Sequence, residues 1–264
     1  MIDSTVISLY AKQLKLPTLS LYPDVVRQAE EFGWGYEDFL CELLRRELKQ
    51  REDKQRQRLL KQAHFTLDKS LDIFDFERLA NVDAAYVWQL ANGEFVERKE
   101  NIILVGNPGT GKTHIAIGLG RRLCGLGYRV SYYNAAALVT QLSEAQQDRQ
   151  LCKITRSLNR SDLLILDELS YLSFTRSQSE LLFHVLSERN ERGSVIITTN
   201  LEFSKWGELF PDSMMTAALV DRLTHNAHIL DMKGPSYRLE DRLKKQCSSK
   251  KNLVDQAKGK DDNN

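Results

Sequence analysis

The sequence contains no apolar run of the roughly eighteen residues that a membrane helix requires. Its start, MIDSTVISLYAKQLKLP, lacks the basic flank, apolar block and small-residue cleavage site of a signal peptide. Cysteine is scarce: Cys41, Cys124, Cys152 and Cys247 are scattered singly among 264 residues, which excludes a zinc knuckle and a disulfide framework. We therefore expect a cytoplasmic protein with reduced thiols and no membrane partner.

The N-terminal part predicts a small all-helical domain, residues 1–65. In EDFLCELLRRELKQ the apolar residues recur at spacings of three, four and one, which is the period of one helical stripe. The next segment, HFTLDKSLDIFDFERL, has no helical period and carries short aromatic anchors. We read it as an extended connector that lies on the following domain, and we place the boundary near residue 65.

Net charge is also nearly absent, at +1, but its distribution is uneven. Residues 45–62 hold eight Lys or Arg against three acids. The basic residues on this expected helix are Arg45, Arg46, Lys49, Arg51, Lys54, Arg56, Arg58 and Lys61. They suffice for several non-specific phosphate contacts with duplex DNA. A solvated charged face is the alternative, because acids and glutamines are interleaved and no base-reading motif appears.

Beyond residue 65 the pattern changes to short apolar runs that alternate with helix-length segments. The runs are NIILVG (101–106), YRVSYYN (128–134), DLLILDE (162–168), SVIITTN (194–200) and AHILDM (227–232). Buried parallel strands joined by crossover helices give this pattern, so an α/β domain over 66–246 with a five-stranded parallel sheet is predicted. The polar stretch 247–264 predicts a disordered tail.

A phosphate-binding loop follows the first expected strand and precedes a helix. Its residues are Gly106, Asn107, Pro108, Gly109, Thr110, Gly111, Lys112 and Thr113, which match GxxxxGK[ST] in full, and His114 comes next. Glycines let successive backbone N–H groups face the phosphates, the lysine reaches the β and γ oxygens, and the hydroxyl binds Mg²⁺. The context predicts ATP and Mg²⁺ as cofactors.

Two acids end the third expected strand, LLILDE. Asp167 is expected in the magnesium shell together with Thr113, and Glu168 is placed to polarise an attacking water. The alternative is a pair of acids that caps the next helix. A glutamate directly after the aspartate argues for hydrolysis over mere binding.

Three further polar residues are candidates for catalysis. Asn200 ends the strand VIITTN at the edge where open α/β sheets bind ligands, with Thr199 as a second choice. Arg222 and Arg238 could supply the positive charge that phosphoryl transfer demands. A turn residue is the ordinary interpretation of Asn200 taken alone, and a solvated surface residue that of either arginine.

With these residues in place, the chain resembles the AAA+ ATPases. More narrowly it resembles the IstB family, the helper ATPases of bacterial insertion sequences, which is similar to the DnaC-type helicase loaders. The resemblance rests on GNPGTGKTHIAIGLG, LLILDELSYL, LLFHVLSERNERGSVIITTN, FSKWGELFPDSMMTAALVDRLTHNAHIL and GPSYRL. The last two motifs are the specific ones, and the match is detailed from about residue 70 to 240.

The resemblance implies an AAA+ P-loop domain with a reduced lid, since only about thirty residues follow the fifth strand. It implies that Asn200 is the sensor-one residue, Arg222 the arginine finger and Arg238 the sensor-two arginine. A finger reaches a neighbouring subunit's nucleotide, so a homo-oligomer with ATP sites between protomers is implied. The family's partners are duplex DNA and a transposase, whose target-site choice the helper directs.

Two other functions stay open at this point. A replicative helicase loader would share the ATPase core and use the N-terminal helices to grip a helicase. A small-molecule kinase or nucleotide switch would need a second substrate motif that the sequence does not offer, and would leave the two arginines without a purpose.

Overall fold

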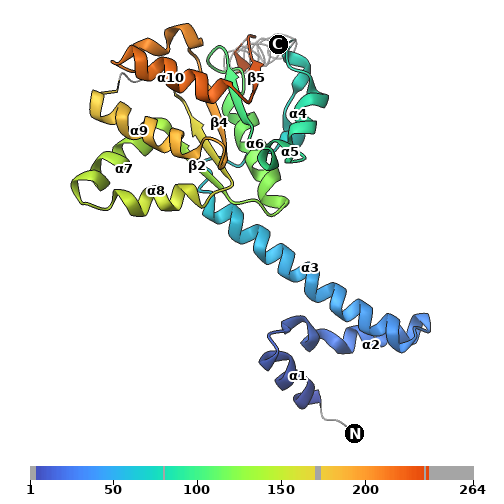
Figure 1. Ribbon diagram of the computed structural model, residues 1–264. Coiled ribbons are helices and arrows are strands. Elements are labelled where there is room, and N and C mark those ends of the chain that lie inside the picture. The colour runs from blue at the N-terminus through green and yellow to red at the C-terminus, as the bar shows by residue number, and fades with distance from the viewer. Residues whose placement is uncertain (1–3, 80, 170–173, 235, 238–264) are drawn as a thin grey trace, which may run out of the picture. The chain divides into compact units, whose positions relative to one another are not determined.

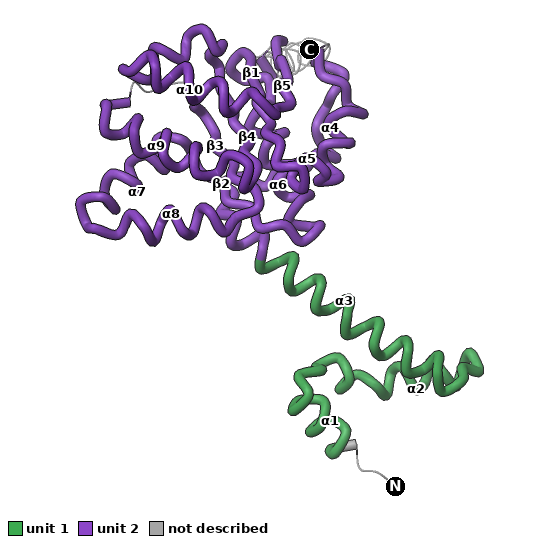
Figure 2. Tube along the Cα trace, in the orientation of Figure 1, with its two compact units in different colours: residues 1–58 green, residues 59–264 purple. Residues whose placement is uncertain are grey.

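The structure is a computed structural model that describes residues 4–79, 81–169, 174–234 and 236–237. It divides the chain into two compact units, residues 1–58 and residues 59–264, shown in separate colours in Figure 2. The division falls inside one long helix, four residues before that helix ends at Gln62. Each unit is described on its own.

The first unit is helical, as expected. It contains α1 (Ser4–Gln13), the 3-10 turn η1 (Pro17–Leu21), α2 (Tyr22–Phe32) and most of α3 (Tyr36–Gln62). A buried carboxylate joins its parts, because Glu47 of α3 accepts hydrogen bonds from the Thr18 backbone N–H at 3.1 Å and from Arg51 Nε at 2.8 Å. The apolar stripe predicted in EDFLCELLRRELKQ is largely exposed. Within this segment Leu43 is buried, whereas Leu40, Leu44 and Leu48 are exposed.

The second unit is built on five parallel strands, which confirms the predicted sheet. The strands are β1 (Asn101–Val105), β2 (Val130–Asn134), β3 (Leu163–Asp167), β4 (Ser194–Thr199) and β5 (Ala227–Asp231). Their order is β2-β3-β4-β1-β5, so the two strands that bear the phosphate loop and the acid pair flank β4. Strands β1, β3 and β4 are buried on both faces, which explains their continuous apolar sequences.

Helices cover both faces of the sheet (Figure 1). One core contains α4 (Ala84–Leu90), α5 (Glu94–Glu97) and α6 (Lys112–Gly125). The other contains α7 (Ala135–Gln147), α8 (Leu151–Asn159), α9 (Arg176–Arg189), η4 (Phe203–Glu208) and α10 (Ser213–Thr224). Trp206 and Phe210 are buried in this second core, where these aromatics have a packing role.

The segment before the sheet wraps around the first core and contains the short turns η2 (Leu71–Ile73) and η3 (Phe76–Arg78). Phe74 is buried, and Phe65 and Phe76 pack against the same core, so this connector does lie on the α/β unit. It also meets the free edge of β2, where the Tyr132 N–H donates to Ala63 O at 3.0 Å. Among the described helices, none is both long and apolar enough to cross a bilayer.

The predicted reduced lid and the tail 247–264 fall almost wholly on residues outside those the structure describes.

Candidate nucleotide-binding site

The glycine-rich loop joins the end of β1 to the first turn of α6. Gly106, Gly109 and Gly111 have φ angles of +154°, +82° and +95°. At Gly106 a Cβ would lie 2.3 Å from the carbonyl oxygen of Met232, which belongs to the backbone after β5. A side chain is therefore excluded, and the loop presents backbone at the N-terminus of a 14-residue helix, where phosphate is favoured.

The side chain of Lys112 folds back onto this loop. Its Nζ donates to the carbonyl oxygens of Gly106 and Asn107, both at 2.7 Å, and its side chain is buried. A buried ammonium needs such partners. Because these acceptors lie within the loop, the charge is held where the β and γ phosphates of a nucleotide would be received.

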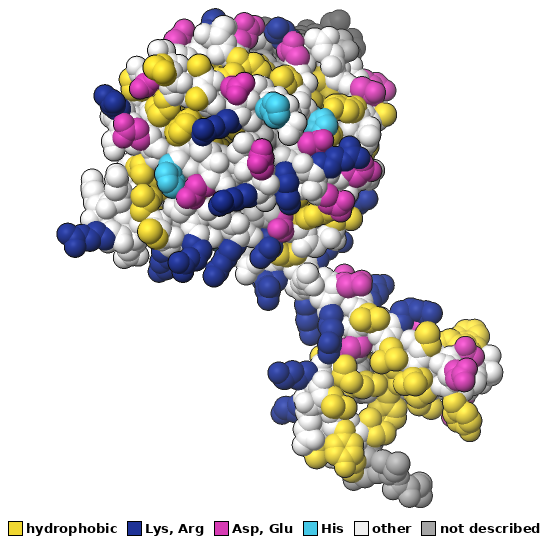
Figure 3. Space-filling view, viewed as in Figure 1, with side chains coloured by type: hydrophobic (Ala, Val, Ile, Leu, Met, Phe, Trp, Pro, Cys, Tyr) yellow, Lys and Arg dark blue, Asp and Glu magenta, His cyan; other side chains and the backbone are white. Residues whose placement is uncertain are grey.

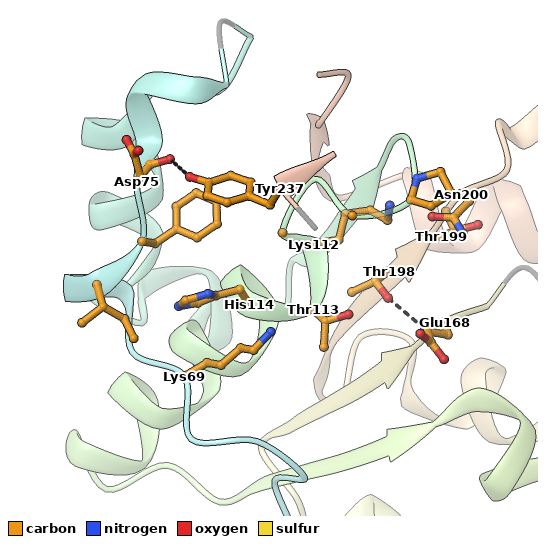
Figure 4. A pocket seen from close by; sticks show the side chains of 15 residues that line it. Lys69, Asp75, Lys112, Thr113, His114, Glu168, Thr198, Thr199, Asn200 and Tyr237 are labelled. Atoms are coloured by element: carbon orange, nitrogen blue, oxygen red, sulfur yellow. Dashed lines mark hydrogen bonds between the residues drawn. The ribbon is translucent and has the colours of Figure 1, made fainter. Parts of the chain in front are cut away.

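A cavity of about 310 Å³ opens beside the loop. Lys112 and Thr113 stand in its middle, with Glu168, Thr198, Thr199 and Asn200 on one side and the connector on the other (Figure 4). The loop, the acid pair and the end of β4 come from segments far apart in the sequence. The sheet order brings them to one edge, as predicted for the carboxyl ends of parallel strands.

Asp167 is fixed by three hydroxyl groups. Thr113 Oγ1 and Thr198 Oγ1 donate to its Oδ1 at 2.9 and 2.5 Å, and Tyr132 OH donates to its Oδ2 at 2.7 Å. Burial raises the pKa of Tyr132, so this hydroxyl stays protonated and remains a donor.

A magnesium ion fits this arrangement. Thr113 lines the cavity, and its hydroxyl donates to the Asp167 carboxylate. Oxygen atoms of this kind are the ligands that Mg²⁺ prefers, alongside waters and substrate phosphates. Within the described residues, no group of three or more His, Cys, Asp or Glu could hold a metal. The two protein oxygens would therefore share the ion with the phosphates.

Glu168 is held by both its backbone and its side chain. Its φ of +61° is unusual for a non-glycine residue, and its N–H donates to Thr198 Oγ1 at 2.8 Å. Asn134 Nδ2 donates to its Oε2 at 3.0 Å, while Asn134 Oδ1 accepts from Ala136 N and caps α7. Asn134 thus ties the glutamate to the start of a helix.

Asn200 and Thr199 both line the cavity, but the hydroxyl of Thr199 has a structural task. This hydroxyl donates to Leu169 O at 2.8 Å and accepts from the Leu201 N–H at 3.1 Å. The side chain is fully buried. Of the two candidates at the end of β4, Asn200 is therefore the one that can face a ligand.

The connector forms the other side of the cavity, with Lys69, Phe74 and Asp75. His114 lies edge-on to Phe74 with ring centroids 5.1 Å apart, and its Nε2 donates to Ser70 O at 2.7 Å. Burial is the main cause that lowers the pKa of His114, so the neutral Nε2–H form is favoured. Its ring nitrogen ties the connector to α6, beside the nucleotide loop.

Tyr237 closes the same side. Its N–H donates to Gly109 O at 3.0 Å, its hydroxyl donates to Asp75 O, and its ring lies 5.9 Å from that of Phe74. The segment after β5 thus joins the phosphate loop to the connector. Arg238, the next residue, lies outside the described residues.

Arg222 does not line the cavity. It lies on α10, where its Nη1 donates to Ser187 Oγ of α9 at 2.6 Å and the guanidinium lies 5.1 Å from the centre of the Phe183 ring. Among the described residues the cavity lining contains lysines but no arginine.

The eight basic residues expected to bind DNA all lie on α3, as predicted, but their engagement differs. Arg45 and Arg46 pair with Glu42, Arg51 pairs with the buried Glu47, and Lys54 bonds to Gln50. The remaining four have no polar partner in the part of the chain that the structure describes; they are Lys49, Arg56, Arg58 and Lys61.

Sequence reasoning missed several side chains of the site. Asn134 ends β2 as Asn200 follows β4, so the rule that selected Asn200 could have selected it too. Thr198 and Tyr132 lie inside strands, and no local pattern distinguishes a strand hydroxyl that reaches an aspartate from one that does not. The connector residues carry no motif at all.

Comparison with known proteins agrees with this site. The family described as "IstB-like ATP binding protein" matches residues 9–245. An ATP-binding protein of insertion sequence IS21 from Pseudomonas aeruginosa is 39% identical over 233 residues, covering 88% of each chain. One of insertion sequence IS5376 from Geobacillus stearothermophilus is 36% identical over 234 residues, covering 88% of this chain and 93% of that one.

Solved structures share the fold. A crystal structure of DnaI matches with a TM-score of 0.53 at 18% identity, covering 68% of this chain and 92% of that one. AMPPCP-bound DnaA from Aquifex aeolicus matches with a TM-score of 0.54 at 18% identity, covering 64% and 51%. The second unit therefore has the AAA+ P-loop fold, and the chain as a whole belongs to the family of IstB-like ATP-binding proteins.

Proposed function

We propose that this protein is an ATP-hydrolysing helper of transposition. It binds ATP with Mg²⁺, assembles as a homo-oligomer on duplex DNA, and engages a transposase to direct where an element inserts. Membership of the family and the insertion-sequence names of its relatives support a role in transposition. The geometry of the nucleotide site supports the ATPase and the oligomer.

The observation that carries the proposal is the separation of Arg222 from the cavity. The cavity is lined by Lys112, Glu168 and Asn200, and by Thr113, whose hydroxyl bonds to Asp167. Phosphoryl transfer also calls for spread positive charge at the γ-phosphate, which an arginine supplies well. Arg222 is exposed, bonds to α9 and does not line its own cavity, which supports a role at the site of a neighbouring protomer.

The side chains of the cavity divide the work of hydrolysis. Lys112 and the loop N–H groups bind the phosphates, and Thr113 with Asp167 would hold Mg²⁺, which neutralises charge on the phosphate oxygens. Glu168, oriented by Asn134, accepts a proton from the attacking water, and Asn200 positions that water. In Arg238 we expect a second arginine that senses the γ-phosphate.

DNA binding rests on the basic helix α3. Lys49, Arg56, Arg58 and Lys61 have no polar partner among the described residues and can contact phosphates. The likeness to DnaI shows the fold alone and does not favour a helicase loader. In a pull-down experiment we expect a transposase to bind this protein. Binding to a hexameric helicase and not to a transposase would contradict the proposed role in transposition.

A mixing experiment tests the shared site. The Arg222→Ala variant retains Asp167 and Glu168, and the Glu168→Gln variant retains Arg222. Each variant alone should bind ATP and hydrolyse it poorly on DNA. Mixed together, they should recover part of the activity, because some sites then combine an intact Glu168 with an intact Arg222. Absence of recovery in a mixture shown to form joint oligomers would mean that Arg222 does not act between protomers.

The matched control is Arg176→Ala. Arg176 is an exposed arginine that pairs with Glu180 within α9. Its replacement should leave hydrolysis unchanged, both alone and in mixtures. A loss equal to that of Arg222→Ala would show that removal of any α9 or α10 arginine disturbs the unit, and the finger role would fail.

A further inference from the structure

A second lysine lines the nucleotide cavity and comes from the connector. Lys69 lies on the connector side of the lining, whereas Lys112 belongs to the phosphate loop. In Figure 4 the Lys69 side chain extends towards Thr113 and His114, and the Lys112 side chain extends towards Asn200. Two ammonium groups thus approach one cavity from different segments, and only Lys112 is part of the phosphate-loop motif.

Two bonds to α6 hold the backbone on either side of Lys69. The residue before it, Asp68, pairs with Arg121 at 2.7 Å. The residue after it, Ser70, accepts a hydrogen bond on its carbonyl oxygen from His114 Nε2 at 2.7 Å. Arg121 and His114 are seven residues apart on α6, which places them on one side of that helix. The connector therefore runs along α6, with Lys69 between two fixed points.

Close packing holds the residues that follow. Leu71 is buried against Gly118 of α6, where an added Cβ would lie 2.8 Å from Leu71 Cγ. The Ser70 hydroxyl accepts from the Asp72 N–H at 3.3 Å and caps the turn η2. Because the backbone is fixed against α6 on this side too, the fold sets the direction in which the Lys69 side chain extends.

The charge of Lys69 acts on the neighbouring imidazole. Burial is the main cause that lowers the pKa of His114, and the positive charge of Lys69 lowers it further. The ammonium group therefore lies close to the first turn of α6, as Figure 4 also shows. Since the neutral form of His114 is favoured, Lys69 is the residue that supplies positive charge at this point of the lining.

The loop and the acid pair set the direction of a bound nucleotide. Loop N–H groups cradle the α and β phosphates, and the loop lysine reaches the β and γ phosphates. Glu168 and Asn200, which we assign to the attacking water, lie on one side of Thr113, so the γ-phosphate belongs on that side. Lys69 lies on the other side, with the connector.

We infer that Lys69 is a second phosphate-binding lysine and that its ammonium group binds the α-phosphate of ATP. The inference rests on the proposed function only in that this cavity takes ATP. Hydrolysis breaks the bond between the β and γ phosphates, so the charge of the α-phosphate changes little between the bound nucleotide and the transition state. Lys69 then stabilises both states equally, and it contributes to affinity and not to kcat.

The Lys69→Met variant of the full-length protein tests the inference, because methionine keeps an unbranched apolar side chain and removes the charge. Affinities for a non-hydrolysable ATP analogue, ADP and AMP are measured without DNA, by displacement of a fluorescent ADP. We expect all three to weaken by the same factor, at least about tenfold, which is the loss of one charge-assisted hydrogen bond. The kcat at saturating ATP should stay within about twofold of that of the unaltered protein.

Other patterns of loss would contradict the assignment. Weakening of the ATP analogue alone would place Lys69 at the γ-phosphate, and weakening of the ATP analogue and ADP with normal AMP binding would place it at the β-phosphate. Unchanged affinity for all three would show that Lys69 binds no phosphate. A normal unfolding midpoint without nucleotide verifies that the variant is folded.

Two control variants separate this contact from a general effect of charge. Lys and Arg side chains are spread over the surface of the second unit (Figure 3), and Lys205 of η4 is an exposed lysine that does not line the cavity. Lys205→Met removes the same charge and should keep all three affinities. Lys69→Arg keeps the charge and should bind within about threefold of the unaltered protein. A loss equal to that of Lys69→Met in either control would overturn the inference.

An NMR titration without nucleotide checks the position of the ammonium group. A positive charge near an imidazole lowers its pKa, so the midpoint of His114 should rise in Lys69→Met and stay the same in Lys205→Met. An unchanged midpoint in Lys69→Met would mean that the ammonium group does not lie beside the first turn of α6, and the assignment would fail.

The outcomes also distinguish this inference from the proposed function. If the unaltered protein binds the three nucleotides but does not hydrolyse ATP on DNA, the proposed function fails, whereas the comparison of affinities still decides the role of Lys69. If the unaltered protein hydrolyses ATP and Lys69→Met binds all three nucleotides normally, only the role of Lys69 is wrong.

Discussion

Tyr132 donates its hydroxyl hydrogen to Asp167 Oδ2 at 2.7 Å, and both side chains are buried. Thr113 and Thr198 donate to the other carboxylate oxygen. The four groups come from β2, β3, α6 and β4, so the position of the aspartate is set by the sheet and not by its own loop. Tyr132 also bonds through its N–H to Ala63, at the point where the connector begins.

The first prediction concerns this hydroxyl. Tyr132→Phe leaves Asp167 Oδ2 buried with one donor fewer, which should lower the free energy of unfolding by about 1–3 kcal/mol. A less firmly held aspartate should bind Mg²⁺ more weakly, so ATP hydrolysis should need about tenfold more Mg²⁺ for half-maximal rate, a weakening of roughly 1.4 kcal/mol. Magnesium titration of the ATPase rate measures this directly.

Tyr133→Phe is the matched control for Tyr132→Phe. The Tyr133 hydroxyl has no hydrogen-bond partner among the described residues, although burial raises its pKa. Its removal should leave the magnesium dependence unchanged. If both variants showed the same dependence as the unaltered protein, Tyr132 would have no part in positioning the aspartate.

The second prediction concerns the contact between Asn134 and Glu168. Asn134→Ser keeps a side-chain oxygen that can cap α7 but removes the amide that donates to Glu168. We expect kcat to fall about tenfold, within the range that a positioned general base contributes, with ATP affinity unchanged. A variant with weakened ATP binding and normal kcat would contradict the orienting role.

Strong local signals made the sheet and the nucleotide loop predictable. All five strands were expected within two residues of their observed bounds. The signal was strongest for β1, β3 and β4, because strands buried on both faces have continuous apolar sequences. The loop has a fixed backbone conformation that demands glycines, and its lysine and threonine follow at set positions. The two acids and Asn200 follow from the rule that parallel strands present ligand groups at their carboxyl ends.

The rest of the site depends on contacts that the sequence does not encode locally. Tyr132 reaches Asp167 only because β2 pairs with β3, and the connector lines the cavity only because Phe74 is buried against α6. The basic α3 was predicted, and the ion pairs of Arg45, Arg46 and Arg51 lie within this helix at spacings of three and four. The further bonds from Arg46 to Gln28 and from Arg51 to Lys15 O require the fold of the first unit. Charge counts therefore overstate what that helix offers to DNA.

The third prediction is a pH dependence at His114. Burial lowers its pKa in the folded state below the ordinary value of 6.5, so the unfolded chain binds a proton more readily. The resulting stability is fully present above the unfolded pKa and is lost as the pH falls through the folded pKa. An NMR titration should give His114 a midpoint below 6.5, the signal being assigned by its absence in His114→Gln.

The same variant measures the thermodynamic consequence. Glutamine does not titrate and can still donate to Ser70 O. The free energy of unfolding should therefore fall less in His114→Gln than in the unaltered protein between about pH 7 and about pH 5. A larger fall in the variant would mean that the protonated imidazole is the stabilised form, which would reverse the sign argued here.

The last prediction concerns Arg189, at the opposite edge of the sheet from the nucleotide. Its guanidinium is buried and donates to the carbonyl oxygens of Leu158, Ser161 and Ser194 at 2.6, 3.1 and 3.0 Å. Burial lowers its pKa to about 10, so the side chain keeps its charge at neutral pH. It joins the end of α8 to the starts of β3 and β4.

Arg189→Met fills a similar volume but leaves three buried carbonyls without their donor. We expect the free energy of unfolding to fall by about 3–5 kcal/mol, as when one partner of a buried charged network is removed. Arg192→Met, at an exposed position three residues on, should change it by less than about 0.5 kcal/mol. Equal urea midpoints for the two variants would show that the carbonyls find other donors, and that Arg189 does not hold this edge of the sheet.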